Sequence, residues 1–216
     1  MAETYKMLTG DEHLTFNGEE LPFTIQRFWQ LNLSVLLLNV TRGSFAEYLV
    51  LCALSKYMSG AMEQVKSGME PWDIDGPELV LPGETRPSRI EVKSTASVQI
   101  DTPDRNEPIS LPDPRLRFGI GKTTTESDPE KKHRSDLYVF AHYTAHRKGD
   151  NILDLGFWEF YVLPTFRIDE DPVLSKQKTI SVWRLRKLKL EPCDFDSLGQ
   201  TILDAQERIS KHFAEQ

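Results

Sequence analysis

Few features of this 216-residue chain suit a secreted, disulfide-bonded or membrane-embedded protein. Its two cysteines, Cys52 and Cys193, lie far apart and lack C-x-x-C spacing, so neither a disulfide framework nor a zinc knuckle is expected. No apolar run approaches the roughly 20 residues that a membrane-spanning helix needs. The first residues lack the basic segment and apolar core of a signal peptide. We therefore expect a single cytoplasmic domain over residues 1–216, without membrane contact.

An excess of positive charge is also missing. The chain has 26 Lys and Arg residues against 33 Asp and Glu residues, a formal charge of −7, which argues against a generic nucleic-acid binder. The charge is unevenly distributed, because residues 115–148 hold eight basic and four acidic residues and residues 184–189 hold four basic and no acidic ones. Candidate nucleic-acid contacts in these clusters are Lys131, Lys132, Arg134, Arg184 and Arg186. Solvated charged faces would explain either cluster equally well.

The apolar pattern predicts an α/β protein in which helices flank a mixed sheet. Helical spacing covers residues 24–40, a segment from a Ser44 cap to about Gly60, and residues 197–213. Strands are predicted near residues 72–75, 88–97, 115–120, 136–143, 157–163 and 179–185. A long loop rich in proline and glycine should join the first two strands. Residues 1–21 are expected to be loosely ordered and residues 122–135 to form a mobile loop.

The segment Arg89–Ser94, RIEVKS, carries the strongest chemical signal. In a strand, Ile90 and Val92 point to one face while Glu91 and Lys93 point to the other. A carboxylate and an ammonium that project together suit metal-assisted phosphodiester hydrolysis, in which one binds the cation and the other acts on the nucleophile or the developing charge. The tripeptide alone is a weak signal, since Glu130–Lys132 repeats it in a polar stretch.

Two acidic features upstream strengthen that signal. Residues 71–75, PWDID, form a short strand-like piece with two aspartates. Glu47 is the only charged residue in the apolar segment 43–55. A lone carboxylate in an apolar helix is costly to bury unless something pairs with it, and a metal site would supply that partner.

The order of these features resembles the PD-(D/E)xK nuclease superfamily, in particular its bacterial restriction-like branches. The resemblance spans residues 42–99 and implies a restriction-endonuclease-like three-layer sandwich and Mg²⁺-dependent cleavage of DNA, with Mn²⁺ as a substitute. It implies that Glu47, Asp73, Glu91 and Lys93 are catalytic. It also implies that Asp73, Glu91 and the Val92 carbonyl bind the metal.

Several alternatives stay open. Trp72 stands where the family has proline before its aspartate, and Asp75 rivals Asp73 as the metal ligand. Gln99 falls on the Lys93 face if the strand stays regular, so it could contact a metal-bound water or the scissile phosphate. An RNA- or junction-specific nuclease, one or two metals and a homodimer all remain open. The rival from another class is a non-catalytic nucleic-acid-binding or assembly module that retains the fold.

Overall fold

A four-stranded mixed sheet organises the residues that the computed structural model describes, which are 7–64, 70–101, 103–104, 113–126 and 128–216. The helical elements are α1 (Ile25–Leu33), α2 (Asn39–Leu54), η1 (Ala61–Glu63), η2 (Leu155–Phe157), α3 (Phe166–Asp169), η3 (Leu174–Lys176), α4 (Val182–Lys187) and α5 (Phe195–Ala214). The strands are β1 (His13–Phe16), β2 (Glu19–Thr24), β3 (Ile74–Leu81), β4 (Glu84–Ala96), β5 (Arg117–Gly119), β6 (Thr123–Thr125), β7 (Asp128–Lys132), β8 (Leu137–Tyr143), β9 (Trp158–Pro164) and β10 (Thr179–Ser181).

The main sheet has the strand order β3-β4-β8-β9. β3 is antiparallel to β4, β4 runs parallel to β8, and β8 is antiparallel to β9. Every residue of β8 is buried, as its apolar and aromatic sequence predicts for a strand covered on both faces. The predicted mixed α/β class is therefore confirmed.

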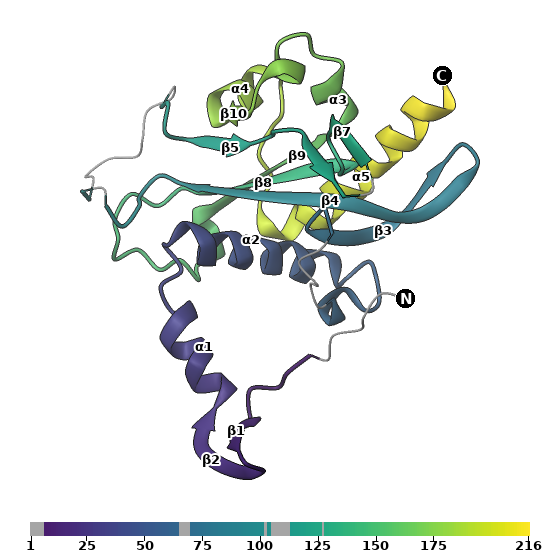
Figure 1. The fold of residues 1–216 in the computed structure, drawn as a ribbon. Helices are drawn as coiled ribbons and strands as arrows, with labels where there is room; N and C mark the ends of the chain where they lie inside the picture. The colour runs from purple at the N-terminus through teal and green to yellow at the C-terminus, as the bar shows by residue number, and fades with distance from the viewer. Residues whose placement is uncertain (1–6, 65–69, 102, 105–112, 127) are drawn as a thin grey trace.

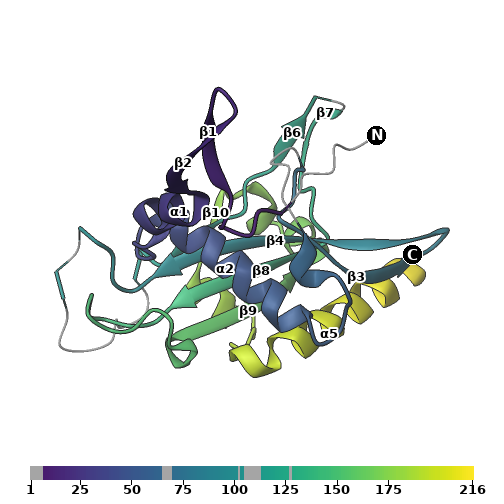
Figure 2. The same cartoon turned by 90° about the horizontal axis from the view of Figure 1, so that it is seen from below.

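Two apolar clusters cover the two faces of this sheet. On one face, side chains of α2 and α5 pack against β4, β8 and β9. On the other face, Tyr138 and Phe140 of β8 pack against a layer that includes β5, β10, α3 and α4. Figures 1 and 2 show α2 and α5 together on one side of the sheet and the smaller elements on the opposite side.

The connection between β3 and β4 is shorter than the sequence predicts. The strands extend through Pro77 and Pro87 and turn at Pro82–Gly83, where Gly83 has φ of 84°. β3 is an edge strand, and β4 pairs with β8 only from Ile90 onward. A proline is tolerated where no neighbouring strand requires its missing N–H. Both strands can therefore contain a proline, and the predicted long loop is wrong.

The helix that carries Glu47 starts earlier than expected. The predicted helix over residues 24–40 ends as α1 at Leu33, and α2 begins at Asn39 and runs through Gly43. The Arg42 guanidinium donates hydrogen bonds to the Leu37 carbonyl at 2.9 Å and to Asn39 Oδ1 at 2.7 Å, which anchors this first turn. Ser44 is therefore an interior residue rather than a cap.

Three further segments contain secondary structure that the sequence did not predict. Residues 13–24 form the β1–β2 hairpin, which turns at Asn17–Gly18 with both φ values positive, a signature of tight hairpins; residues 1–6 of the expected loose segment lie outside the described residues. The expected mobile loop contains the β6–β7 hairpin. The strand predicted over residues 179–185 stops at Ser181, whose side chain caps α4 by accepting a hydrogen bond from the Arg184 N–H. Along the described chain, none of the helices combines the length and apolar character needed to cross a bilayer.

The contact between α2 and α5 gives a test of the packing that supports Glu47. A Cβ added at Gly199 of α5 would lie 2.7 Å from the Ala53 carbonyl and would also meet the Tyr57 ring, whereas a Cβ at Gly43 of α2 would meet nothing within 4 Å. We expect Gly199→Ala to lower the free energy of unfolding in urea by about 1–3 kcal/mol through overpacking. The matched control, Gly43→Ala, should raise it by about 0.5–1 kcal/mol. Equal effects of the two substitutions would contradict the close helix contact.

Candidate functional site

The site lies next to the first residue of β3. Beyond this point β3 no longer pairs with β4, and this edge of β4 is open. Ile74, the first residue of β3, is in register with Ile90 of β4, and the N–H of Asp73 donates to the Ile90 carbonyl at 2.9 Å. Asp73 Oδ2 then accepts a hydrogen bond from the Val92 N–H at 2.8 Å. The Asp73 carboxylate thus occupies the position along β4 that a further β3 residue would have taken. The Val92 carbonyl points to this same edge, because the N–H and C=O of one strand residue face the same neighbour.

Glu91 and Lys93 lie on the sheet face opposite α2 and α5. Their register partners in β8 are Tyr138 and Phe140, which belong to the second apolar cluster. Lys93 Nζ contacts the Glu91 carboxylate and lies 3.6 Å from Asp73 Oδ2. The three side chains are only 18–35% exposed, so the two carboxylates and the ammonium form a half-buried cluster.

The charges around Lys93 connect three segments of the chain. Burial lowers the pKa of Lys93, but the charges of Glu91 and Asp73, the hydrogen bond with Glu91 and the charge of Glu47 outweigh burial, so the pKa is raised above its ordinary value. Glu47 on α2 therefore lies within electrostatic range of the Lys93 ammonium. The four residues selected from the sequence converge on one region.

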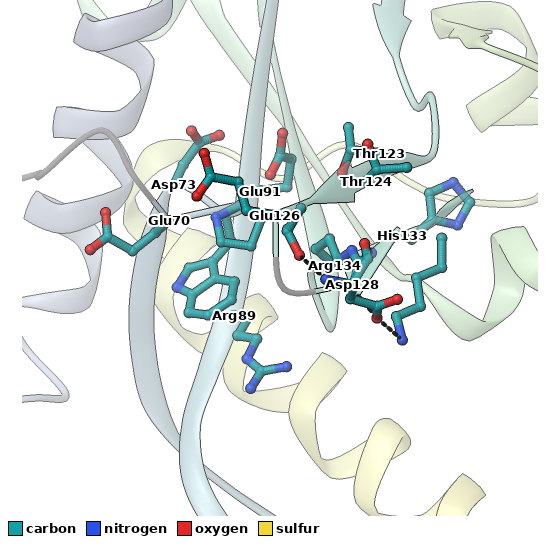
Figure 3. A pocket seen from close by; sticks show the side chains of 14 residues that line it. Glu70, Asp73, Arg89, Glu91, Thr123, Thr124, Glu126, Asp128, His133 and Arg134 are labelled. Atoms are coloured by element: carbon teal, nitrogen blue, oxygen red, sulfur yellow. Dashed lines mark hydrogen bonds and ion pairs between the residues drawn. The ribbon is translucent and has the colours of Figure 1, made fainter. Parts of the chain in front are cut away.

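A cavity of about 1020 Å³ opens beside this cluster. Asp73 and Glu91 line one side, and Thr123, Thr124 and Asp128 of the β6–β7 hairpin line the other. Figure 3 shows Glu70, Asp73 and Glu91 facing Thr123, Thr124 and His133 across it. The His133 imidazole is held between the Ile120 carbonyl and the Asp169 carboxylate, each at 2.9 Å, which fixes the segment that follows the hairpin.

The structure separates Asp73 from its rival. Asp75 lies in β3, where its carboxylate accepts a hydrogen bond from the Trp72 indole N–H at 2.9 Å and its backbone is bound by the Gln64 side chain. Asp73 lines the cavity and Asp75 does not. Gln99 lies three residues beyond the end of β4 at Ala96, so the even spacing that would have placed it beside Lys93 does not apply.

Most of the basic residues predicted to contact nucleic acid are tied to carboxylates of the chain itself. Lys132 and Arg134 both bind Asp128 at 2.6 Å, and these hydrogen bonds hold the pKa of Asp128 well below its usual range. Arg184 binds Asp171 at 2.9 Å. Arg186 binds the Glu159 carboxylate at 3.1 Å and the Tyr161 hydroxyl at 3.0 Å. Lys131, by contrast, is an exposed residue of β7.

Arg89 and Trp72 are among the cavity residues that were not selected as site residues from the sequence. The Arg89 guanidinium lies over the Trp72 ring, 4.6 Å from the ring centroid, and both residues line the cavity with Asp73 and Glu91. Arg89 alternates with Glu91 and Lys93, so the period of two that placed those residues on one face also places Arg89 there. The sequence therefore held a signal for Arg89, but none for its contact with Trp72.

No three His, Cys, Asp or Glu side chains form a group that could hold a metal ion by themselves within the described parts of the chain. A comparison with known protein families, curated protein sequences and solved structures found no match. The class of protein is thus defined by its own structure, a mixed α/β protein with a half-buried Asp–Glu–Lys cluster at an open sheet edge.

The Glu159 network at the other end of the sheet gives a pH-dependent test. The neighbouring His142, whose Nδ1 lies 3.7 Å from Glu159 Oε2, and then Arg186 and Tyr161 lower the pKa of Glu159 to about 2 against the effect of burial. A depressed folded pKa stabilises the fold above the ordinary value of 4.5, and this stabilisation is lost as the pH falls toward 2. We expect Glu159→Gln to lower the melting temperature at pH 7 and to flatten its fall between pH 5 and pH 2.

The exposed residue Glu207, which pairs with Lys211 on the surface of α5, provides the matched control. Glu207→Gln should leave the pH dependence of the melting temperature unchanged, since exposed ion pairs contribute little. If Glu159→Gln retained the wild-type acid dependence, the assigned network would be wrong.

Proposed function

We propose that this chain is a Mg²⁺-dependent endonuclease that hydrolyses DNA phosphodiester bonds, with the restriction-endonuclease-like fold of the PD-(D/E)xK superfamily. The observation that carries the proposal is the convergence of Asp73, Glu91 and Lys93 at the open edge of β4. The chain order supports it too, since α2 with Glu47 precedes β3, the Asp73 segment and β4. A restriction or defence role, a cytoplasmic location and a homodimer remain predictions from the sequence.

The donor set fits Mg²⁺. Asp73 and Glu91 supply carboxylate oxygens, and the Val92 carbonyl faces the same edge as Asp73. Mg²⁺ is usually held by one or two carboxylates together with waters and substrate phosphates, so a third acidic ligand is not required. When bound, the ion would lower the pKa of a coordinated water and offset charge on the phosphate. Mn²⁺ has the same preference for oxygen ligands.

The protein's own groups then have separate roles. Asp73 and Glu91 hold the cation, and the hydrogen bond from the Val92 N–H fixes one Asp73 oxygen in place. Lys93 donates hydrogen bonds that orient the attacking water or stabilise negative charge on the phosphate. Glu47, whose charge reaches Lys93, holds a metal-bound water or a second ion.

A second candidate is favoured by the same contacts. Lys93 already neutralises charge at Asp73 and Glu91 without any cation. A nucleic-acid-binding or assembly module that retains the nuclease fold would keep such a cluster for stability alone. The two candidates differ in whether the protein cleaves DNA when a divalent cation is present.

The test of catalysis is nicking of supercoiled plasmid. We expect wild-type protein to nick it with Mg²⁺ or Mn²⁺ and not with EDTA. Lys93→Ala should keep its fold and its metal affinity but lose about 10²–10⁴-fold in rate or more, the range for one group that handles a proton in the transition state. Wild-type nicking by Lys93→Ala would remove the assigned role. A wild-type protein inactive with every divalent cation would favour the binding module.

The test of the metal ligands compares the two neighbouring aspartates by calorimetry. Asp73→Asn should abolish measurable Mg²⁺ binding, because it removes a charged ligand from the cavity. Asp75→Asn is the matched control and should bind Mg²⁺ as wild type does, since Asp75 accepts a hydrogen bond from the Trp72 indole N–H and its backbone is bound by Gln64. The reverse ranking would move the metal site to Asp75.

A further inference from the structure

Arg89 differs from the other cations of the cavity in having no carboxylate partner among the residues that the structure describes. Lys132 and Arg134 are bound to Asp128. The Arg89 guanidinium, by contrast, makes no ion pair or side-chain hydrogen bond to any described residue, and its recorded contact is with the face of the Trp72 ring. A guanidinium stacked on an aromatic ring keeps its in-plane N–H donors available. Arg89 therefore lines the cavity with a guanidinium that forms no ion pair with a described residue.

Both members of this pair are held in place from outside the cavity. The Arg89 N–H donates to Asp136 Oδ2 at 2.8 Å, and the Arg89 carbonyl accepts from the Asp136 N–H at 2.7 Å. The Trp72 indole N–H donates to Asp75 at 2.9 Å, which fixes the ring under the guanidinium. The pair is organised before any ligand binds, so little conformational entropy is lost when a ligand arrives.

The position of Arg89 relative to the Asp–Glu–Lys cluster identifies the ligand. Arg89, Glu91 and Lys93 alternate along β4, and two strand residues span about 6.8 Å, which is comparable to the distance between neighbouring phosphates of one nucleic-acid strand. Arg recognises phosphate through two parallel hydrogen bonds. Figure 3 shows Arg89 displaced along β4 from Asp73 and Glu91.

We propose that Arg89, stacked on Trp72, forms a phosphate-binding site that holds the phosphate adjacent to the scissile one. The inference rests on the proposed nuclease function, because the scissile phosphate is placed at Glu91 and Lys93. Trp72 is a positioning residue that orients the guanidinium, and Asp75 orients Trp72. The aspartate that the sequence left as a rival metal ligand thus supports the neighbouring subsite.

The experiment compares Arg89→Ala, Arg89→Lys and Trp72→Leu with Arg208→Ala. Arg208 is an exposed residue of α5, so its loss controls for net charge. Plasmid nicking should show a KM raised about 10–100-fold in Arg89→Ala, as expected for one lost charge-assisted contact, with a much smaller change in kcat. The KM values of Arg89→Lys and Trp72→Leu should fall between those of Arg89→Ala and wild type. Both variants keep a cation at position 89, but the first loses the planar guanidinium and the second loses the ring on which it stacks. Arg208→Ala should match wild type.

Binding is measured separately from cleavage. In the Lys93→Ala background with Mg²⁺, fluorescence anisotropy of a labelled DNA duplex gives the affinity as a function of salt concentration. Adding Arg89→Ala should reduce the slope of log affinity against log salt by about 1, as the loss of one phosphate contact requires. A purely structural Arg89–Trp72 contact would instead lower the melting temperature and leave this slope unchanged.

The outcomes separate the two proposals. Cleavage by Arg89→Ala with the wild-type KM and salt slope overturns the phosphate site and leaves the nuclease intact. A wild-type protein that fails to nick, combined with an affinity that still falls on loss of Arg89, overturns the nuclease and retains the phosphate site on a binding module. If Arg89→Ala does not fold, the KM values of Arg89→Lys and Trp72→Leu decide, and wild-type KM values in both overturn the site.

Discussion

The hydrogen bond from the Val92 N–H to the Asp73 carboxylate is the constraint on which the site depends. It forms because β3 stops pairing with β4 beyond Ile90 while β4 continues to Ala96. An unpaired N–H at that half-buried edge would be costly, so the side chain of the preceding segment replaces the missing strand. The same bond fixes a carboxylate beside Glu91 and Lys93, so one structural requirement also assembles the chemical groups.

The parallel pairing of β4 with β8 fixes which way those groups face. β8 is buried along its whole length, and its register with β4 runs without a shift from Ile90 to Ala96. A slip of one residue would place Glu91 and Lys93 in the apolar layer under α2 and α5. The buried strand thus determines the orientation of the charged face, although it contributes no charged group itself.

The sequence predicts the parts of this arrangement that depend on local periodicity. The alternation in Arg89–Ser94, the aromatic β8 and β9 and the amphipathic α5 are all readable, and they are confirmed. The start of α2, the extent of β3 and β4 and the β6–β7 hairpin were not predicted, because contacts of individual side chains and the edge positions of two prolines determine them, and neither follows from an apolar period. Arg42 anchors a helix turn through Leu37 and Asn39, edge positions tolerate Pro77 and Pro87, and Asp128 ties Lys132 and Arg134 together.

The residues of the candidate site likewise fall into those that the sequence predicts and those that it does not. Glu91 and Lys93 follow from the period of a strand, and Asp73 and Glu47 from a resemblance in chain order. The partners of the basic residues could not be predicted from apolar periodicity, because that pattern does not show which carboxylate each cation contacts. Arg184 binds Asp171, and Arg186 binds Glu159 across β9 and α4. Where a paired carboxylate offsets the charge of each basic residue, a cluster of basic residues in the sequence does not form a basic surface in the fold. If the proposed function holds for this chain of charge −7, attraction of DNA would come from bound metal and from cations without a carboxylate partner among the described residues, which gives the stacked Arg89 more weight than the denser basic clusters.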